Sequence, residues 1–437
     1  MPSITRLAIA LFPIVGAVFA QTAPAPTPPM GWNSWDAFGT GVTEEEVKAN
    51  ADYMSAKLAK YGWQYIVVDI QWSDPQAKAH GYRRDAELAM DEYGRLIPTT
   101  NRFPSGFKAL ADYVHGKGLK FGIHIMRGIP RQAVRANCPI EGSKYHAADI
   151  ANAGSICKWN NDMYGVNMTK PGAQDYYDSI VRLYARWGVD FIKADNMLDN
   201  DDRREIEGLS AAIANGKRPM VLSLSPGPAK LQQAAFLSEQ AQMWRISADF
   251  WDRWQDLRRM FDLLPPWAQY AKSGNWPDAD MIPLGRIGIR AERGDDRKSL
   301  LTQDEQQTLM TLWTVARSPL MFGGDLPSND QWTLSLLTNS EAIAVNQKAL
   351  RSRQLFAKDN HVAWMADLPH REAAVALFNT GEKEEDVRLD FAEFGLPAKS
   401  QANEIWTGKN LGNVESGLVA HLRPHASAYY RLSHLKQ

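Results

Sequence analysis

The sequence has 437 residues, 44% of them hydrophobic, so the chain is longer than one ordinary domain and can form a sizeable packed core. Its 49 basic and 50 acidic side chains give a formal net charge of −1, which argues against nucleic acid or an anionic membrane surface as a partner. The composition therefore favours a neutral substrate, and it leaves open whether the chain forms a homo-oligomer.

Residues 1–20 have the pattern of a secretory signal peptide. Arg6 is followed by an apolar stretch that ends at Phe19, and small residues precede the expected cleavage site after Ala20. The apolar stretch is shorter than the roughly 20 residues of a membrane span. We therefore expect cleavage and a secreted or periplasmic protein, with an uncleaved anchor as the alternative. The proline-rich residues 21–29 predict an extended linker.

From residue 30 onward, short apolar runs of strand type alternate with helical patterns. Two of the helices begin with capping-box spacing, Thr43 with Glu46 and Thr302 with Glu305. The eight predicted strands are Met30–Ser34, Tyr65–Ile70, Lys120–Ile125, Phe191–Asp195, Met220–Ser225, Met243–Ser247, Trp276–Ile282 and Leu320–Gly323. Eight strand and helix units over residues 30–346 predict an α/β fold, a (β/α)₈ TIM barrel. A doubly wound open sheet is the alternative, but no glycine-rich phosphate-binding fingerprint follows any strand.

The last part of the chain, residues 347–437, has a different pattern. Its short alternating runs, such as His361–Ala366 and Ala373–Phe378, are separated by turn residues. This pattern predicts a C-terminal antiparallel β-sandwich domain.

Polar side chains at the ends of the barrel strands form the candidate site. In a parallel barrel the last residues of every strand meet at one rim, where barrel enzymes place their active sites. We expect at this rim Trp32, Trp35, Asp69, His124, Arg127, Lys193, Asp195, Ser225, Arg245, Asp249, Asp278 and Asp280. The nine histidines show no metal-ligand spacing, so neither a metal nor a cofactor is predicted.

Asp195 and Asp249 each end a short apolar run of strand type, and together they suggest the carboxylate pair that cleaves glycosidic bonds. Lys193 lies on the same strand face as Asp195, where its charge would keep a nucleophilic carboxylate ionised. Asp249 is followed by Phe250 and Trp251, whose apolar side chains would favour the protonated form that a general acid needs. For either acid alone, a helix cap or a surface position is the alternative.

Four other residues have two interpretations each. His124 either contacts a ligand or is a structural histidine, and Trp32 either stacks on a sugar or packs in the core. Cys138 and Cys157, the only two cysteines, form either a disulfide or two buried thiols.

Motifs from Pro28 to the C-terminus resemble those of glycoside hydrolase family 27, the α-galactosidases and α-N-acetylgalactosaminidases. They are Pro28-Pro-Met-Gly-Trp-Asn-Ser-Trp35, Gly118-Leu-Lys-Phe-Gly-Ile-His124, Ile192-Lys-Ala-Asp-Asn196, Trp276-Pro-Asp-Ala-Asp-Met281 and Ala316-Arg-Ser-Pro-Leu-Met321. The resemblance implies a catalytic barrel, a β domain, and a retaining mechanism with two aspartates and no metal.

By this resemblance Asp195 matches the nucleophile and Asp249 the acid/base. The sugar-binding positions that it implies are Trp32, Asp69, Lys193, Arg245 and Asp280, and it also implies a disulfide between Cys138 and Cys157.

The departures from the family pattern concern the substrate. Ile70 follows Asp69 where the family typically has a second aspartate, and Ser225 stands where strand five usually ends in Glu-Trp or a similar element. On strand three, His124-Ile-Met-Arg127 takes the place of a tyrosine followed by an acid. Because a buried polar site selects substrates by the hydrogen bonds that it can satisfy, these changes could redirect specificity.

The predicted function is a retaining exo-glycosidase, an α-galactosidase acting on terminal α-D-galactosyl residues of oligo- or polysaccharides. β-L-arabinopyranosidase, α-N-acetylgalactosaminidase and isomalto-dextranase activities are alternatives within the family. Two other classes stay open, a catalytically silent sugar-binding protein on the same fold and a metal-dependent barrel hydrolase.

Overall fold

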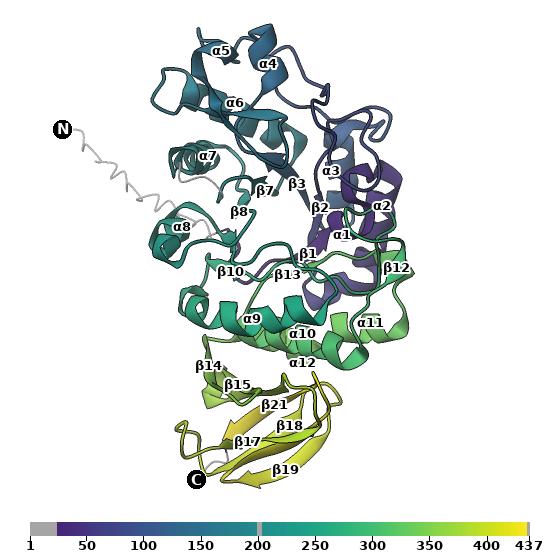
Figure 1. Ribbon diagram of the computed structural model, residues 1–437, viewed down its shortest axis with the longest axis vertical. Coiled ribbons are helices and arrows are strands. Elements are labelled where there is room, and N and C mark those ends of the chain that lie inside the picture. Colours follow the sequence, from purple (N-terminus) through teal and green to yellow (C-terminus); the bar gives the residue numbers. More distant parts are fainter. Residues whose placement is uncertain (1–23, 199–202, 435–437) are drawn as a thin grey trace, which may run out of the picture.

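The computed structural model describes residues 24–198 and 203–434. It has a barrel whose elements lie between Met30 and Lys348 and a smaller β domain that packs against the barrel's helices (Figure 1). The predicted signal peptide lies outside the described residues.

Eight parallel strands form the barrel, and they correspond to the eight predicted ones. Their order is β10-β9-β8-β7-β3-β2-β1-β13. A parallel bridge between Ile282 and Phe322 joins the two ends of this sheet, and the Ile282 amide donates a hydrogen bond to the Met321 carbonyl at 2.7 Å. The strands are β1 (Met30–Asn33), β2 (Tyr65–Val68), β3 (Lys120–Met126), β7 (Phe191–Asp195), β8 (Val221–Leu224), β9 (Met243–Arg245), β10 (Trp276–Asp278) and β13 (Leu320–Phe322).

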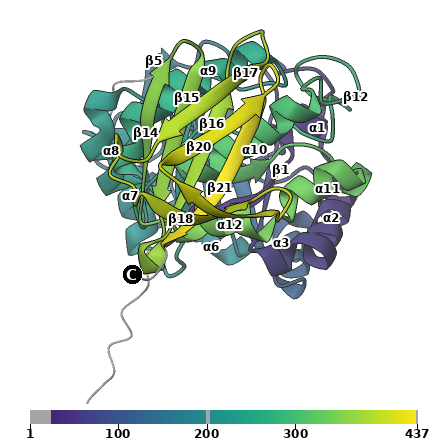
Figure 2. The same ribbon diagram turned by 90° about the horizontal axis from the view of Figure 1, so that it is seen from below.

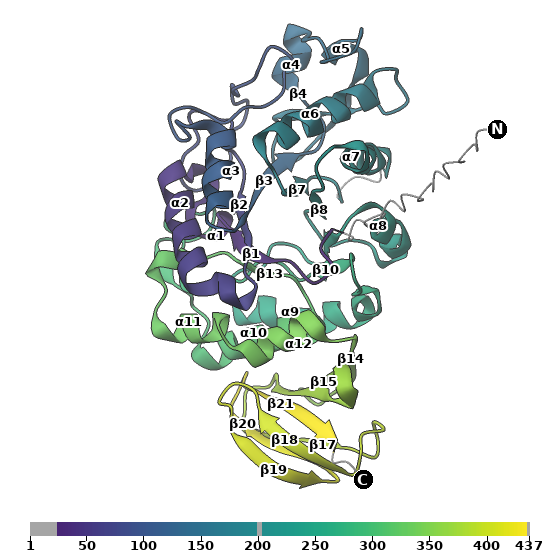
Figure 3. The ribbon, with the colours of Figure 1, turned by 180° about the vertical axis from the view of Figure 1, so that it is seen from behind.

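Helices surround the strands and bury an apolar face against them (Figures 1 and 3). They are α1 (Trp35–Phe38), α2 (Glu44–Tyr53), α3 (Gly106–Gly116), α4 (Arg131–Ala136), α5 (Ala147–Ile150), α6 (Ala173–Trp187), α7 (Arg203–Asn215), α8 (Ala234–Gln240), α9 (Trp254–Trp267), α10 (Gln303–Ala316), α11 (Gln331–Leu337) and α12 (Ser340–Lys348). Among the described residues, none of the helices is long and apolar enough to cross a membrane.

Short elements decorate the barrel. A three-stranded sheet, β4 (Ile129–Pro130), β6 (Met163–Val166) and β5 (Ala151–Ile156), follows β3, and the hairpin β11 (Arg286–Ile287) and β12 (Arg297–Lys298) follows β10. The single turns of helix in the barrel are η1 (Gly39–Gly41), η2 (Met54–Leu58), η3 (Ala59–Tyr61), η4 (Leu231–Gln233), η5 (Ala268–Tyr270) and η6 (Leu326–Ser328). One more, η7 (Pro369–Arg371), lies in the β domain.

Both predicted capping boxes are present. The Thr43 side chain accepts a hydrogen bond from the Glu46 amide at the start of α2, and Thr302 accepts one from Glu305 at the start of α10. In each pair the glutamate carboxylate accepts a hydrogen bond from the threonine amide, so two otherwise unpaired helix donors are satisfied.

The described part of the predicted linker, residues 24–29, packs against the barrel. The Ala25 carbonyl accepts a hydrogen bond from the Trp276 indole at 2.8 Å, and the Pro28 carbonyl accepts one from Gln347 at 2.9 Å. Pro28 and Pro29 are buried. This segment is therefore held by backbone hydrogen bonds, which proline carbonyls can accept although proline has no N–H to donate.

The C-terminal domain is antiparallel throughout. Its larger sheet has the order β14-β15-β16-β21-β18-β19, and β17 pairs with β20 in a second sheet. The side chains between the two sheets form a core of their own, as expected for a β sandwich. The strands are β14 (Arg351–Lys358), β15 (His361–Asp367), β16 (Ala373–Asn379), β17 (Glu385–Asp390), β18 (Lys399–Glu404), β19 (Asn410–Glu415), β20 (Gly417–Leu422) and β21 (Ser427–His434).

Helix α10 lies between the barrel and the β domain, whose larger sheet covers it in Figure 2. Its buried face extends over nearly its whole length, from Thr308 to Ala316. One continuous apolar cluster joins barrel residues such as Phe261 to Phe378 and Tyr429 of the larger sheet. The two domains thus share a core.

Candidate active site

A cavity of about 430 Å³ opens at the carboxyl ends of the barrel strands, within the usual size range of small-molecule sites. Trp35 of α1 lines it, and so do six of the charged residues predicted at the rim: Asp69, Lys193, Asp195, Arg245, Asp249 and Asp280. These six come from β2, β7, β9 and β10 or from the residues just after these strands. The parallel barrel therefore brings together side chains that are up to 211 residues apart, as the rim argument predicted.

Asp195, the last residue of β7, is buried and held by two hydrogen bonds. His124 Nε2 lies 3.0 Å from its Oδ2, and the Asn196 amide donates to its Oδ1 at 2.8 Å. Burial alone would raise the pKa of Asp195, but the hydrogen bond from His124 and the charge of Lys193 hold it below its ordinary value. Asp195 is thus an ionised, oriented carboxylate with one face toward the cavity.

Lys193 and Asp69 form an ion pair beside Asp195. Lys193 Nζ lies 2.9 Å from Asp69 Oδ2, which also accepts a hydrogen bond from Asn33 at 2.7 Å. Burial would raise the pKa of Asp69, but the Lys193 ammonium lowers it to about 2. Both groups stay charged at neutral pH and can accept from or donate to the hydroxyl groups of a sugar.

Arg245 connects the remaining two acids. Its Nη2 lies 2.6 Å from Asp280 Oδ2 and 3.3 Å from Asp249 Oδ1. Burial, opposed by Arg245 and reinforced by Asp249, raises the pKa of Asp280 to about 7. The Asp249 side chain is 43% exposed, against 12% for Asp195, so one acid is reachable from solvent while the other is enclosed.

The apolar surroundings predicted for Asp249 are only partly present. Trp251 does line the cavity, but the Phe250 ring turns into the core and packs on Trp313 at a centroid distance of 5.1 Å. The charged neighbour Arg245 contacts Asp249 instead. The following residues therefore do not enclose this carboxyl in an apolar pocket.

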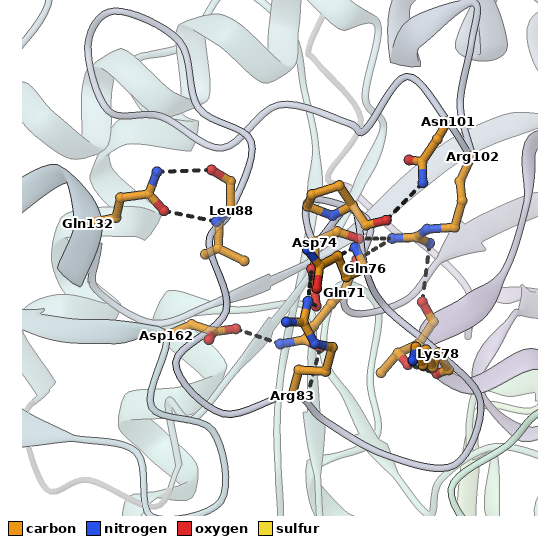
Figure 4. A network of polar contacts seen from close by, with 12 residues as sticks. Gln71, Asp74, Gln76, Lys78, Arg83, Leu88, Asn101, Arg102, Gln132 and Asp162 are labelled. Atoms are coloured by element: carbon orange, nitrogen blue, oxygen red, sulfur yellow. Dashed lines mark hydrogen bonds and ion pairs between the residues drawn. The ribbon is translucent and has the colours of Figure 1, made fainter.

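The loop between β2 and α3 forms one wall of the cavity, and a buried arginine holds it in place (Figure 4). Arg102 donates to the carbonyl oxygens of Thr40, Val42, Gln71 and Asp74 at 2.6–3.1 Å. The Asp74 carboxylate in turn accepts from Arg83, next to Tyr82, at 2.8 Å. A loop with no regular secondary structure is thus fixed by side-chain donors.

Three aromatic rings lie along this wall. Tyr82 stacks on Trp35 with ring centroids 5.4 Å apart and meets Trp159 at 4.9 Å. All three residues line the cavity. Aromatic faces of this kind pack against the apolar faces of sugar rings.

Three predicted sugar contacts lie outside the cavity. Trp32 is 0% exposed and donates its indole N–H to the Gly324 carbonyl at 2.8 Å, so it packs in the barrel wall, and its neighbour in the motif, Trp35, faces the cavity. His124 is 1% exposed, and its Nε2 lies 3.0 Å from Asp195 Oδ2. Ser225 is also buried, and within the described residues its Oγ has no hydrogen-bond partner; the Pro226 and Gly227 that follow it line the cavity instead.

Two other residues of the predicted rim make structural contacts outside the cavity. Arg127 forms a buried ion pair with Glu205, and Asp278 accepts a hydrogen bond from the Asp280 amide at 2.9 Å. Neither of them lines the cavity.

Sequence reasoning missed several cavity residues. Asp36 directly follows the strand-one motif, and its position next to Trp35 was the signal that could have identified it. Tyr82, Trp159 and Glu292 lie in loops without periodic patterns, and no sequence signal placed them at the rim.

The disulfide implied by the family resemblance is not formed. The Cys138 side chain packs beside Gly94 and the large apolar cluster outside the strands, whereas Cys157 lies in a separate cluster near Ile70 and Met163. Burial raises the pKa of the Cys138 thiol. The structure therefore does not support the disulfide, and of the two thiols only that of Cys157 is buried.

Within residues 24–198 and 203–434, no group of three or more His, Cys, Asp or Glu side chains has the arrangement of a metal site. The chemistry that the cavity offers is that of carboxylates. It combines an enclosed carboxylate, a more exposed carboxyl and charged groups suited to hydroxyls, beside an aromatic wall at the rim of a barrel. This combination defines a barrel glycosidase.

The comparisons with known proteins agree. The family model described as Alpha galactosidase A matches residues 27–167 and 164–348, and the model of the Alpha galactosidase C-terminal beta sandwich domain matches residues 358–432. The chain therefore belongs to the α-galactosidase family, glycoside hydrolase family 27, and is a retaining glycosidase.

Individual relatives cover nearly the whole chain. Alpha-galactosidase 2 of Arabidopsis thaliana is 30% identical over 417 residues, which are 94% of this chain and 90% of the relative. The structure of a family 27 β-L-arabinopyranosidase from Geobacillus stearothermophilus is 51% identical, with a TM-score of 0.93 over 94% of this chain and 97% of that chain. The α-galactosidase I of Mortierella vinacea, 22% identical with a TM-score of 0.72, shares the fold over 94% of this chain and 98% of its own.

Proposed function

We propose that the enzyme removes terminal sugars with the ring configuration of α-D-galactose, and that its preferred substrates within this class are β-L-arabinopyranosides. The two glycosides share the stereochemistry of every ring hydroxyl. They differ in the hydroxymethyl group on C5, which arabinopyranose lacks. α-Galactosidase activity, the first prediction from the sequence, is the second candidate.

The observation that carries this preference is Ile70. The family typically has a second aspartate here, next to Asp69, and it grips galactose hydroxyls. In this chain the position is 5% exposed and directly follows Asp69, which lines the cavity. Ile70 lines a small neighbouring cavity and belongs to an apolar cluster that includes Trp35, Trp251 and Met281, and these three side chains line the cavity with the acids. An apolar wall leaves a hydroxymethyl group without a hydrogen bond, whereas a sugar without that group loses nothing.

The similar proteins support both candidates. The β-L-arabinopyranosidase of Geobacillus stearothermophilus is about half identical to this chain, whereas the curated plant α-galactosidases are about 30% identical. Asp69 and Lys193, which can bind the hydroxyl groups common to both sugars, are kept in this chain. We therefore expect one site to accept both sugars and to prefer the arabinopyranoside.

In the proposed reaction, Asp195 attacks the anomeric carbon and forms a glycosyl ester. Asp249 first protonates the departing glycosidic oxygen and then takes a proton from the water that hydrolyses the ester. The enclosure of Asp195 and its hydrogen bonds suit a nucleophile that must not move. The greater exposure of Asp249 suits a group that exchanges a leaving group for water.

The substrate assignment is tested with nitrophenyl glycosides of β-L-arabinopyranose, α-D-galactose, α-N-acetyl-D-galactosamine and α-D-glucose. We expect the highest kcat/KM on the arabinopyranoside. Ile70→Asp should raise the galactoside to arabinopyranoside ratio of kcat/KM about tenfold or more, because the new carboxylate can bind the C6 hydroxyl. Ile70→Val is the matched control and should leave the ratio within about twofold. A ratio unchanged by Ile70→Asp would remove Ile70 as the basis of the preference.

The catalytic assignment is tested with Asp195→Asn, which keeps the shape of the side chain and removes its charge. Turnover should fall by about 10⁴-fold or more, because no carboxylate remains to form the ester, while the circular dichroism spectrum stays that of the parent. Covalent labelling of the parent by a mechanism-based inactivator of matching configuration should map to Asp195. Near-normal turnover of the variant would refute this role.

We also propose that the protein is exported, on the basis of the signal-peptide pattern of residues 1–20. N-terminal sequencing of the protein recovered from outside the cytoplasm of its host should begin near residue 21. A protein that keeps residues 1–20 would contradict cleavage.

A further inference from the structure

Asp36 is a buried acid at the cavity that none of the roles assigned above uses. It follows Trp35 in α1, at the end of strand β1, and is 1% exposed. It lines the same cavity as Asp195 and Asp249. Among the described residues, its Oδ2 has no hydrogen-bond partner.

A buried carboxyl without a partner destabilises the fold by about 1–3 kcal/mol or more, so its presence requires a reason. The usual structural reason is a helix cap, but the cap residue of α1 is Ser34, and in the described part of the chain Asp36 Oδ2 accepts no hydrogen bond from a helix amide. The other structural reason is an ion pair. The cation whose charge acts on Asp36, Lys193, is already paired with Asp69 at 2.9 Å.

The backbone holds this acid rigidly. The Asp36 carbonyl accepts a hydrogen bond from the Gly288 amide at 2.8 Å, and the Arg290 amide binds the next carbonyl, that of Ala37, at 2.9 Å. The carboxyl fits against Gly323 after β13, where an added Cβ would approach Oδ2 to 1.9 Å. Only glycine at position 323 leaves room for the carboxyl group of Asp36. The segments that follow β1 and β13 therefore fit together at this acid.

The charges that face Asp36 are three carboxylates and one ammonium. They are Asp280 after β10, Asp249 and Asp252 after β9, and Lys193 of β7. Burial, followed by repulsion from Asp280, raises the pKa of Asp36 well above its ordinary value. A protonated carboxyl can donate a hydrogen bond, which the ionised acids of the cavity cannot.

We propose that Asp36 binds the terminal sugar of the substrate, and that it does so as a neutral carboxylic acid which donates a hydrogen bond to a sugar hydroxyl. Asp69 and Asp195 accept hydrogen bonds, so Asp36 supplies a complementary donor in the same cavity. Its missing partner in the free enzyme is then the substrate. This inference rests on the proposed function, since it assumes that a sugar occupies the cavity.

The test measures the affinity of the free monosaccharide by calorimetry, with L-arabinose and D-galactose as probes, between pH 6 and pH 9. Asp36→Ala removes the donor and should weaken binding about 10- to 100-fold at every pH. Asp36→Asn keeps a neutral donor of the same shape and should bind within about threefold of the parent at pH 6. Asp262→Asn, on the exposed face of α9, is a control that should change nothing.

The dependence of affinity on pH separates this role from a structural one. Parent affinity should fall as the pH rises, because ionised Asp36 cannot donate a hydrogen bond. The Asn variant has no proton to lose there, so its affinity should fall less over the same range. The difference between the two profiles belongs to Asp36, since Asp249, Asp252, Asp280 and Lys193 are present in both proteins.

Three results would overturn the proposal: an Asp36→Ala variant that folds and binds within twofold of the parent, an Asn variant that binds as weakly as Ala, or identical pH profiles for parent and Asn variant. If Asp36→Ala fails to fold, the comparison of the Asn variant with the parent still decides. Should the glycoside panel show that the enzyme prefers a different sugar, the proposed function is wrong, and the Asp36 test is run with that sugar.

Discussion

At the scale of single residues, His124 shows how a side chain outside the cavity can control the chemistry inside it. It is 1% exposed, and its Nε2 makes a side-chain hydrogen bond to Asp195, at 3.0 Å. Its backbone carbonyl accepts a hydrogen bond from the Trp72 indole at 2.7 Å, and this contact helps to hold strand β3 in place. His124 therefore positions the carboxylate proposed as the nucleophile and does not bind the sugar directly.

His124→Phe keeps the size of the side chain but removes this hydrogen bond. We expect kcat to fall about 10- to 100-fold, with a much smaller change in KM. Because the lost hydrogen bond had lowered the pKa of Asp195, that pKa should rise. The nucleophile must be ionised, so the acid limb of the pH profile of kcat/KM should shift to higher pH.

His124→Gln is the matched control, since it restores a neutral donor at the same position. It should recover part of kcat and move the acid limb back toward that of the parent. A purely structural role would lower the activity of both variants without shifting the limb.

At the scale of secondary structure elements, a buried ion pair fixes the end of β7. The Arg127 guanidinium contacts Glu205 of α7, and its Nε donates to the Asn196 carbonyl at 3.1 Å. The Arg127 amide donates to the Asp195 carbonyl at 2.9 Å. Glu205 also accepts from the Tyr177 hydroxyl of α6 at 2.7 Å, so three elements meet at this pair.

Glu205→Leu should destabilise the protein by about 3–5 kcal/mol, because it removes the carboxylate that the buried Arg127 guanidinium contacts. The double variant Arg127→Met with Glu205→Leu removes both charges and should recover more than half of this loss. Denaturant unfolding of the two single variants and the double variant measures the coupling. Additive losses in the double variant would contradict a paired role.

The strands and their terminal acids could be predicted from the sequence because both depend on local patterns. An apolar run followed by an acid gives the strand and its end, and parallel closure then brings Asp69, Asp195 and Asp280 together whatever the loops do. The direction in which a side chain points could not be predicted in the same way. Trp32 and Trp35 belong to one motif, and only the packing of Trp32 against Phe38 decides which of them faces the cavity.

Loop contributions could not be predicted for a different reason. Tyr82 reaches the cavity because Arg102 and Asp74, about 10 to 20 residues away, hold its loop by hydrogen bonds to irregular backbone. Such contacts follow no period in the sequence. The prediction of a disulfide was wrong for a similar reason, since the spacing of Cys138 and Cys157 in the sequence does not show that they pack in different clusters.

At the scale of the whole molecule, the shared core between the barrel and the β domain predicts how the protein unfolds. Phe378 of β16 meets Phe261 of α9 with ring centroids 5.0 Å apart, and both side chains are almost fully buried. Polar contacts frame this core: the Trp406 indole donates to Thr311 of α10 at 2.9 Å, and His425 stacks on Trp254 of α9 at 3.7 Å. Separating the domains would expose α10 as well as the sheet that covers it.

Phe378→Ala should therefore lower the free energy of unfolding of the entire chain by about 3–5 kcal/mol, the usual loss for a buried aromatic ring. Guanidinium unfolding followed in parallel by tryptophan fluorescence and by glycosidase activity measures this loss. Because the domains share one core, both signals should move together to lower denaturant in the variant. Val419→Ala, at a position of β20 that is 53% exposed, is the control and should stay within about 0.5 kcal/mol of the parent. If activity survives a first transition in which the β domain is lost, the barrel is stable alone and the shared core does not couple the two domains.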